Sequence, residues 1–234
     1  VRMMTTGQFK DLGSALLQGA PTNLTFDQAK YWISNKRKLA TEIQKILGVL
    51  NPYYADLIAD WEAVYADLGI LTDFSSLVIP EKQVGLDRLI IEADGLSPQK
   101  VYDLCSRFFK CWKWTNKSLD EVITHSDRVG LHAVWVKETV EADENLKNLS
   151  ANQLKEINIK GITFNEHGLY RAKYFKETNK HLDLSNWTLC TGSRFSYGNV
   201  PRVCWYDFGG GMEVGYASPS YARGSLRARA VLSL

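Results

Sequence analysis

The chain falls into three parts that differ in the spacing of their hydrophobic positions. In the first part, up to about residue 70, apolar residues recur every three or four positions, which is typical of amphipathic helices. Thr25 and Gln28 have the spacing of a capping box, and Asn51–Pro52 should interrupt the helical region. One apolar stripe ends at Gly69 and consists of Tyr54, Leu57, Ile58, Trp61, Val64, Tyr65 and Leu68. It predicts either packing against the rest of the chain or an assembly surface through which the N-terminal helices form an oligomer.

The second part, from about residue 71 to 186, mixes strand and helix patterns. β-Branched and aromatic residues predict strands at 85–93 and 131–138. Ser97–Pro98 predicts the start of a helix, and its inward face would carry Val101, Leu104, Cys105, Phe108 and Trp112. Two further capping boxes predict helix starts, at Ser118–Glu121 and Thr163–Glu166.

From Asn186 onward, short segments with a period of two alternate with Gly, Ser and Pro, which predicts strands and turns. The segments read NWTLC, VPRVCWY, MEVGYA and LRARAVLSL. Gly209–Gly211 between two of them predicts a hairpin turn, because no helix start follows that could make a phosphate-binding loop. The sequence therefore predicts an α+β protein, with a helical region over 1–70 and an α+β domain over 71–234.

One predicted strand has an unusual outward face. Val203 and Trp205 alternate with Arg202, Cys204 and Tyr206, so a cation, a thiol and a phenol share one side. The same period of two places further residues outward, and Gly215 joins them if Val214 and Tyr216 face the core. These residues are Phe195, Tyr197, Asn199, Tyr221, Arg223 and Ser225. Exposed aromatic and arginine side chains are typical anchors of binding surfaces, so the pattern predicts a ligand-binding patch.

Composition excludes several classes of partner. Charged residues make up 23% of the chain and the net charge is +2, which indicates no preference for nucleic acid. No run approaches ~18 consecutive apolar residues, so no membrane span is expected. The N-terminus lacks the apolar segment of a signal peptide. These features are compatible with a cytoplasmic or virion-associated protein and leave the localisation unknown, because a leader removed by processing would leave secretion open as well.

The residues that commonly carry catalysis or bind metals show no such spacing. None of the four cysteines forms a C-x-x-C pair, and the four histidines have no spacing for shared ligation. No G-x-S-x-G motif is present. We therefore expect no catalytic residue, no metal and no cofactor. The alternatives are an enzyme that uses Cys190 or Cys204 on thiol or peptide substrates, and a structural virion or assembly protein.

The C-terminal part also has a biased set of residue types. All lysines lie at or before Lys180, whereas five arginines follow. From residue 191 to the end, Lys, Glu, Gln, Met and Trp occur only as Trp205, Met212 and Glu213. These five types cannot be encoded by codons with a pyrimidine in the third position (NNY). Such a bias is expected where the adenines of AAY codons are randomised, although a strand region rich in Gly and Ser could show it by chance.

The run TLCTGSRFSYGNVPRVCWYD, followed by VGYASPSYARGSLRARAVLSL, resembles the C-terminal variable region of proteins diversified by diversity-generating retroelements. The similarity covers roughly residues 131–234 and extends more weakly from about residue 79. The type is similar to variable proteins of archaeal viruses and uncultured microbial lineages. The resemblance implies a C-type lectin fold, related to that of formylglycine-generating enzymes. It also implies a non-enzymatic protein that binds an unknown protein or surface ligand, as in receptor or host-surface recognition.

The resemblance further implies a variable region over about 191–229. Its variable, ligand-binding positions would be Phe195, Tyr197, Asn199, Arg202, Cys204, Tyr206, Asp207, Gly215, Ser218, Tyr221, Arg223 and Ser225. Its scaffold positions would be Arg194, Val200, Pro201, Val203, Trp205, Leu226, Arg227 and Arg229. The chain lacks the E-P-N, Q-P-D and W-N-D motifs of sugar-binding C-type lectins, so calcium-dependent sugar binding is not expected. It also lacks the cysteine arrangement of the formylglycine-generating enzymes.

Overall fold

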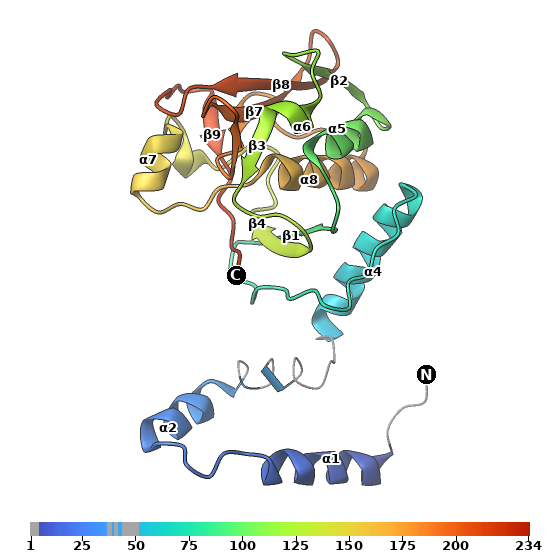
Figure 1. The fold of residues 1–234 in the computed structure, drawn as a ribbon, viewed down its shortest axis with the longest axis vertical. Helices are drawn as coiled ribbons and strands as arrows, with labels where there is room; N and C mark the ends of the chain where they lie inside the picture. Colours follow the sequence, from blue (N-terminus) through green and yellow to red (C-terminus); the bar gives the residue numbers. More distant parts are fainter. Residues whose placement is uncertain (1–4, 37–38, 40–41, 44–51) are drawn as a thin grey trace. The chain divides into compact units, whose positions relative to one another are not determined.

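A computed structural model describes residues 5–36, 39, 42–43 and 52–234 (Figure 1). The chain divides into two compact units, 1–56 and 57–234. The first unit contains α1 (Thr6–Gln18) and α2 (Phe26–Ser34). The predicted capping box is confirmed, because the Thr25 hydroxyl accepts from the backbone N–H of Gln28. The predicted break at Asn51–Pro52 lies partly outside the described residues, and α4 (Pro52–Asp67) begins at the proline.

The second unit is α+β, as predicted. Its helices after α4 are α5 (Pro98–Ser106), α6 (Leu119–Val122), the 3₁₀ helix η1 (Glu144–Leu146), α7 (Ala151–Glu156) and α8 (Phe164–Thr178). Its strands are β1 (Arg88–Glu92), β2 (Lys110–Lys113), β3 (Ile123–Ser126), β4 (His132–Val136), β5 (Trp187–Leu189), β6 (Ser193–Phe195), β7 (Val200–Tyr206), β8 (Gly211–Ala217) and β9 (Leu226–Ala228). The strands predicted at 85–93 and 131–138 are therefore confirmed as β1 and β4, and the four C-terminal segments as β5, β7, β8 and β9.

The strands form one mixed sheet and two antiparallel pairs. The five-stranded sheet has the order β2-β8-β7-β5-β9, in which β2–β8 and β5–β9 are parallel pairs. The pairs are β1–β4 and β3–β6. The chain end returns to β4, where Trp135 and Leu232 exchange two backbone hydrogen bonds. These two hydrogen bonds hold the last residues of the chain against β4.

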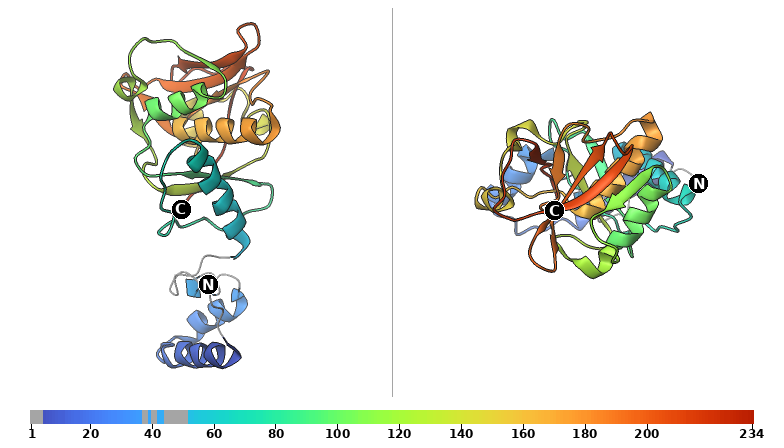
Figure 2. Two further views of the ribbon diagram at one scale, coloured as in Figure 1. Left: turned by 90° about the vertical axis from the view of Figure 1, so that its right-hand side faces the viewer. Right: turned by 90° about the horizontal axis from the view of Figure 1, so that it is seen from above.

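Helix α8 lies between the five-stranded sheet and the β1–β4 pair, and α5 packs along it (Figures 1 and 2). The predicted capping box starts α8, since the Thr163 hydroxyl accepts from the Glu166 N–H and the Glu166 side chain accepts from the Thr163 N–H. Gly168 permits the close approach of α5. A Cβ on that glycine would lie 2.4 Å from Cγ1 of Val101. The helix is buried over most of its length, so it forms the central layer of the unit.

Helix α4 packs against β1 and does not form an unpaired stripe. The Trp61 indole donates to the carbonyl of Leu89 at 3.1 Å, and the Tyr65 hydroxyl donates to the carbonyl of Ile91 at 2.8 Å. Both aromatic side chains are buried. Packing against the rest of the chain is therefore confirmed for this part of the stripe, whose residues from Leu57 onward belong to the second unit.

The helix predicted from Ser97–Pro98 is confirmed but is shorter than expected. It ends at Ser106, and Trp112 lies on the edge strand β2 with 41% of its surface exposed. The expectation that Trp112 faces the core from a helix is wrong. Lys110, Trp112 and Trp114 follow one another at intervals of two residues, as expected for one face of a strand, and this segment does not continue the helix.

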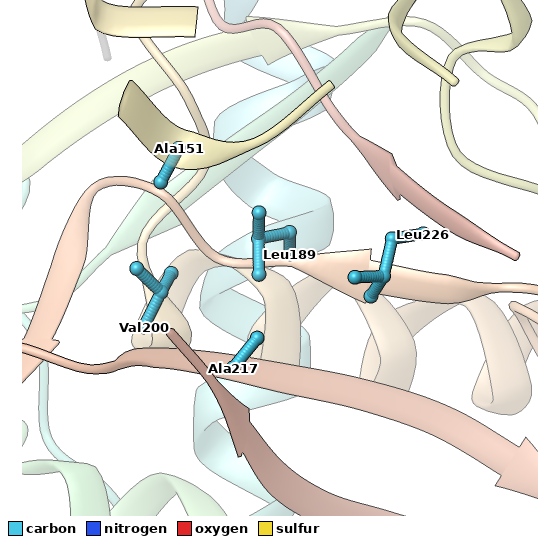
Figure 3. Close-up of a cluster of buried hydrophobic side chains, with 5 residues drawn as sticks. All are labelled: Ala151, Leu189, Val200, Ala217 and Leu226. Atoms are coloured by element: carbon cyan, nitrogen blue, oxygen red, sulfur yellow. The ribbon is translucent and has the colours of Figure 1, made fainter. Parts of the chain in front are cut away.

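The short helix α7 covers part of one face of the five-stranded sheet. Ala151 packs there against Leu189, Val200, Ala217 and Leu226, and all five are buried (Figure 3). Their apolar contacts fix β5, β7, β8 and β9 relative to one another. The end of the β7–β8 hairpin at Val200 and Ala217 is therefore closely packed, and it supports the part of the same sheet face that α7 does not cover.

Candidate functional site

The predicted binding residues are centred on the hairpin of β7 and β8. Its seven paired positions run from Val200↔Ala217 to Tyr206↔Gly211. The turn between the strands contains Gly210 at φ 60°, a conformation that glycine adopts without steric cost. The predicted hairpin at Gly209–Gly211 is confirmed, and the alternation within β7 follows the prediction. Val203 is buried, and the inward Trp205 ring stacks on the His181 ring.

The middle of the outer face is closely packed. The Arg202 guanidinium lies 4.0 Å from the centre of the Trp187 ring, in a cation–π contact. A Cβ on Gly215 would lie 3.2 Å from Nε of Arg202 and 3.6 Å from the Trp187 ring. Arg202 therefore lies over the glycine and against the indole. Gly215 is buried for this reason, although its strand position is outward as predicted.

Two outward assignments and one inward assignment need correction. Phe195 is only 3% exposed. Its backbone pairs with that of Ile123 in β3, and its ring packs edge-on against the Trp114 ring, with the ring centres 5.6 Å apart. Cys204 shares the face of Arg202 but is only 6% exposed. Tyr216, which was expected in the core, is 48% exposed and packs against Trp114 at 5.0 Å.

The remaining predicted positions are at least partly exposed, but they do not form one continuous patch. Tyr197 is 82% exposed and lies in the turn before β7, whose first residue, Val200, pairs with Ala217 just before the 218–225 loop. That loop carries Ser218, Tyr221, Arg223 and Ser225, whereas Asn199 precedes β7. Tyr206 and Asp207 lie at the other end of the hairpin, on the order of 20 Å away for a strand of this length. Arg202 lies between the two groups.

A pocket that the sequence reasoning missed adjoins Tyr206. Its volume is about 270 Å³, and its lining residues are Trp112, Lys113, Trp114, Tyr206, Gly209 and Glu213. The two tryptophans come from β2 and its extension, outside the predicted variable region. The signal that could have found them is the alternation in KCWKW at 110–114, which places both tryptophans on one side of a strand.

The aromatic walls of this pocket are held in place by their neighbours. The Trp112 ring lies against the backbone of two glycines. A Cβ on Gly209 would lie 2.6 Å from this ring, and a Cβ on Gly211 would lie 2.7 Å from it. The Trp114 ring is held edge-on between Phe195 and Tyr216. Both indoles remain nearly half exposed. These contacts orient both indoles before any ligand enters.

A fully buried ion network joins α8, β5 and the segment that follows β9 around Asp183. The Asp183 carboxylate accepts from Nη2 of Arg229 at 2.8 Å, from Nη2 of Arg171 at 2.7 Å and from the Thr188 hydroxyl at 2.8 Å. Nε2 of His167 lies 2.8 Å from the same carboxylate. Burial alone would raise the pKa of Asp183, but Arg229, His167 and Arg171 outweigh it and hold that pKa well below its usual range. The network is structural, because none of its groups reaches solvent.

A second titratable group of residues lies between β1, β4 and α8. Arg128 donates to both oxygens of Glu166, and Nε2 of His132 lies 2.9 Å from Oε1 of the same residue. Glu92 accepts from Nδ2 of Asn165 at 2.8 Å, and burial raises the pKa of Glu92 to about 7. Burial would also raise the pKa of Glu166, but the hydrogen bonds from Arg128 and His132 lower it overall. Glu92 and Glu166 are buried, so substrate has no direct access to them.

The cysteines are free and have the chemistry of packed thiols. Burial raises the pKa of Cys204 to about 12 and raises that of the fully buried Cys190 as well. Both side chains therefore remain protonated at neutral pH. The nucleophilic form of cysteine is the thiolate, so neither side chain is in its reactive form. Across the described part of the chain, no cluster of three or more His, Cys, Asp or Glu side chains could hold a metal ion.

Comparisons of the chain with protein-family models, with curated proteins and with solved structures gave no match. In the residues that the structure describes, no helix has both the length and the apolar character needed to cross a bilayer.

Proposed function

We propose that this chain is a non-enzymatic, diversified ligand-binding protein on a C-type lectin scaffold, in which retroelement mutagenesis varies surface residues for receptor or host-surface recognition. The observation that carries the proposal is a difference in burial within 191–229. Nine of the twelve proposed variable positions are at least partly exposed, whereas Phe195, Cys204 and Gly215 are buried. The positions proposed as scaffold include Val200, Val203, Leu226 and Arg229, which are at most 1% exposed. Tyr197, by contrast, is 82% exposed.

The physical basis is that the scaffold orders the backbone before any ligand binds. Fixing one residue of backbone costs about 1–2 kcal/mol, and here core packing and the Asp183 network already provide this order. Substitutions at exposed positions usually change stability by within about ±0.5 kcal/mol, so many combinations of side chains can share one fold. Tyrosines such as Tyr197, Tyr206 and Tyr221 also provide contact area at low entropic cost.

The proposal assigns the buried candidates a smaller role. Phe195, Cys204 and Gly215 have little or no surface for direct contact, so substitutions there would act through the packing of Trp114 or Arg202. The direct contacts are assigned to the exposed and partly exposed candidates. Cys190 and Cys204 provide no support for an enzyme, because burial keeps both as thiols.

The deciding experiment is to sequence the DNA that adjoins the coding sequence. The proposal expects a near-identical template repeat of the variable region, a reverse transcriptase gene, and sibling sequences that differ at NNY-compatible codons. If neither the repeat nor the reverse transcriptase gene is present, diversification by a retroelement is refuted.

A library of variants tests separately whether the scaffold tolerates substitutions at the exposed positions. Randomised codons at Tyr197, Tyr206, Tyr221 and Arg223 should leave most variants folded, whereas polar substitutions at Val203 should not. Equal tolerance at both sets of positions would contradict the assignment of scaffold and display residues.

A further inference from the structure

We propose that the pocket between β2 and the β7–β8 turn is an anchor site for a basic side chain, arginine or lysine, on the surface of a protein partner. The inference rests on the proposed function for its biological role, and it names the ligand chemistry of one part of the binding face. It depends physically on the lining residues alone, namely Trp112, Lys113, Trp114, Tyr206, Gly209 and Glu213.

The walls suit a cation. Three of the lining side chains are aromatic, and the faces of Trp and Tyr rings attract ammonium and guanidinium groups through their quadrupoles. The Trp112 ring is fixed against the backbone of Gly209, and the Trp114 ring is fixed by Phe195. A cation that enters therefore finds ring faces already oriented, so little side-chain freedom is lost on binding.

The pocket offers a carboxylate to a cation, whereas Lys113 lies on the opposite face of β2, because Lys113 pairs with Val214 and Trp112 pairs with Glu213. The Glu213 carboxylate is half-buried, and among the described residues it has no hydrogen-bond or ion-pair partner. The amine of Lys113 is already engaged, because it donates to Oε1 of Gln99 at 3.1 Å and to the carbonyl of Lys117. Arg202, the nearby cation of β7, is held against Trp187. The pocket thus presents a carboxylate that is not neutralised by a bonded cation.

The size of the pocket is sufficient for a basic side chain. Sites for drug-sized molecules typically enclose ~300–1,000 Å³ and bury most of the ligand. The volume here, about 270 Å³, accommodates one side-chain head group. Tyr206 at the edge and Phe208 in the adjacent turn are 46% and 96% exposed, so they provide apolar contact around the anchor. Trp, Tyr and Arg are enriched among the residues that contribute most to the affinity of protein–protein contacts.

Most of the anchor would also be constant between siblings. Trp112 and Trp114 lie outside the predicted variable region, and NNY codons cannot encode Glu213. Tyr206 is the one predicted variable wall, and Phe195, which packs against Trp114, is a predicted variable position behind the pocket. A shared anchor beside varied contacts would let siblings dock the same kind of basic residue and differ in what surrounds it.

The experiment uses the full chain and two short peptides that differ at one position, acetyl-Gly-Ser-Arg-Ser-Gly-amide and its citrulline counterpart. Citrulline has nearly the shape of arginine but no charge. A third peptide carries lysine in place of arginine and shows which cation is preferred. The readout is the pair of indole N–H signals of Trp112 and Trp114 in ¹H–¹⁵N spectra, assigned with W112F and W114F.

The proposal expects saturable shifts of both indole signals with a basic peptide, and binding at least about tenfold weaker for citrulline. Glu213→Gln should weaken the basic peptide by a similar factor, whereas Glu156→Gln on the exposed end of α7 should not. Equal affinity for arginine, lysine and citrulline, no saturable shift with any peptide, or equal effects of the two glutamine variants would each overturn it. This outcome is independent of retroelement diversification, because a missing template repeat would refute the proposed function and leave the peptide titration unaffected.

Discussion

Replacing Glu92 by glutamine should make the protein more stable at neutral pH. Glu92 on β1 is 2% exposed. One carboxylate oxygen accepts from Asn165, and the other has no hydrogen-bond partner within the described residues and lies 3.8 Å from Nε2 of His132. Glutamine has nearly the same shape and keeps a carbonyl oxygen for Asn165. The substitution therefore removes a buried charge with little change in packing.

The sign of the effect follows from the pKa of Glu92, which burial raises from 4.5 to about 7. A carboxyl with a higher pKa in the folded state binds its proton more tightly there, so its contribution to stability is present at low pH. That contribution is lost as the pH rises from about 4.5 to about 7. At about 1.4 kcal/mol per pKa unit, the loss is on the order of 3 kcal/mol. The pKa of His132 is also raised, against the effect of burial, by its hydrogen bond to Glu166, and its contribution is lost in the same direction above pH 6.5.

Urea unfolding of the full chain, followed by tryptophan fluorescence between about pH 5 and about pH 8, measures this dependence. The wild-type free energy of unfolding should fall across the range, and that of Glu92→Gln should fall by on the order of 3 kcal/mol less. Glu156→Gln, which removes an exposed carboxylate from α7, serves as the matched control and should follow the wild type. If Glu92→Gln shows the wild-type slope, Glu92 is not the buried titrating group and the reasoning is refuted.

Three further outcomes are expected from single substitutions, each measured by urea unfolding. Asp183→Asn should cost about 3–5 kcal/mol, because it leaves the buried Arg229 guanidinium without its counter-charge; a loss below 1 kcal/mol would contradict this. Gly168→Ala should cost about 1–3 kcal/mol, because its Cβ would meet Val101 at 2.4 Å, and an unchanged midpoint would show that α5 moves freely. Tyr197→Ser should change stability by no more than about 0.5 kcal/mol, and a larger loss would mean that this exposed ring has a structural role.

Much of the local structure could be predicted from residues close together in the chain. The capping boxes at Thr25, Ser118 and Thr163 involve partners three residues away, and each is present in the structure. The hairpin at Gly209–Gly211 depends on a turn and on the alternation beside it, and it too was predictable. These features hold because their hydrogen bonds close within one turn of backbone.

The composition of the candidate site could be predicted only in part. Alternation correctly placed Arg202 and Tyr206 on the face opposite Val203. It could not show that Phe195 is covered by Trp114, whose position in the chain is 81 residues earlier. The period of two assigns a side chain to one face of a strand, but only packing decides whether that face is open.

The sequence by itself determined the α+β fold class and most of the strands and helix starts. It also showed a bias in residue types over 191–234. The tertiary structure alone decided what is exposed within that segment, and it brought Trp112 of β2 and the following Trp114 beside Glu213 to form a pocket. The physical reason is range. Backbone hydrogen bonding and periodicity act between neighbours in the chain, whereas burial and charge pairing depend on residues that only the folded chain brings together.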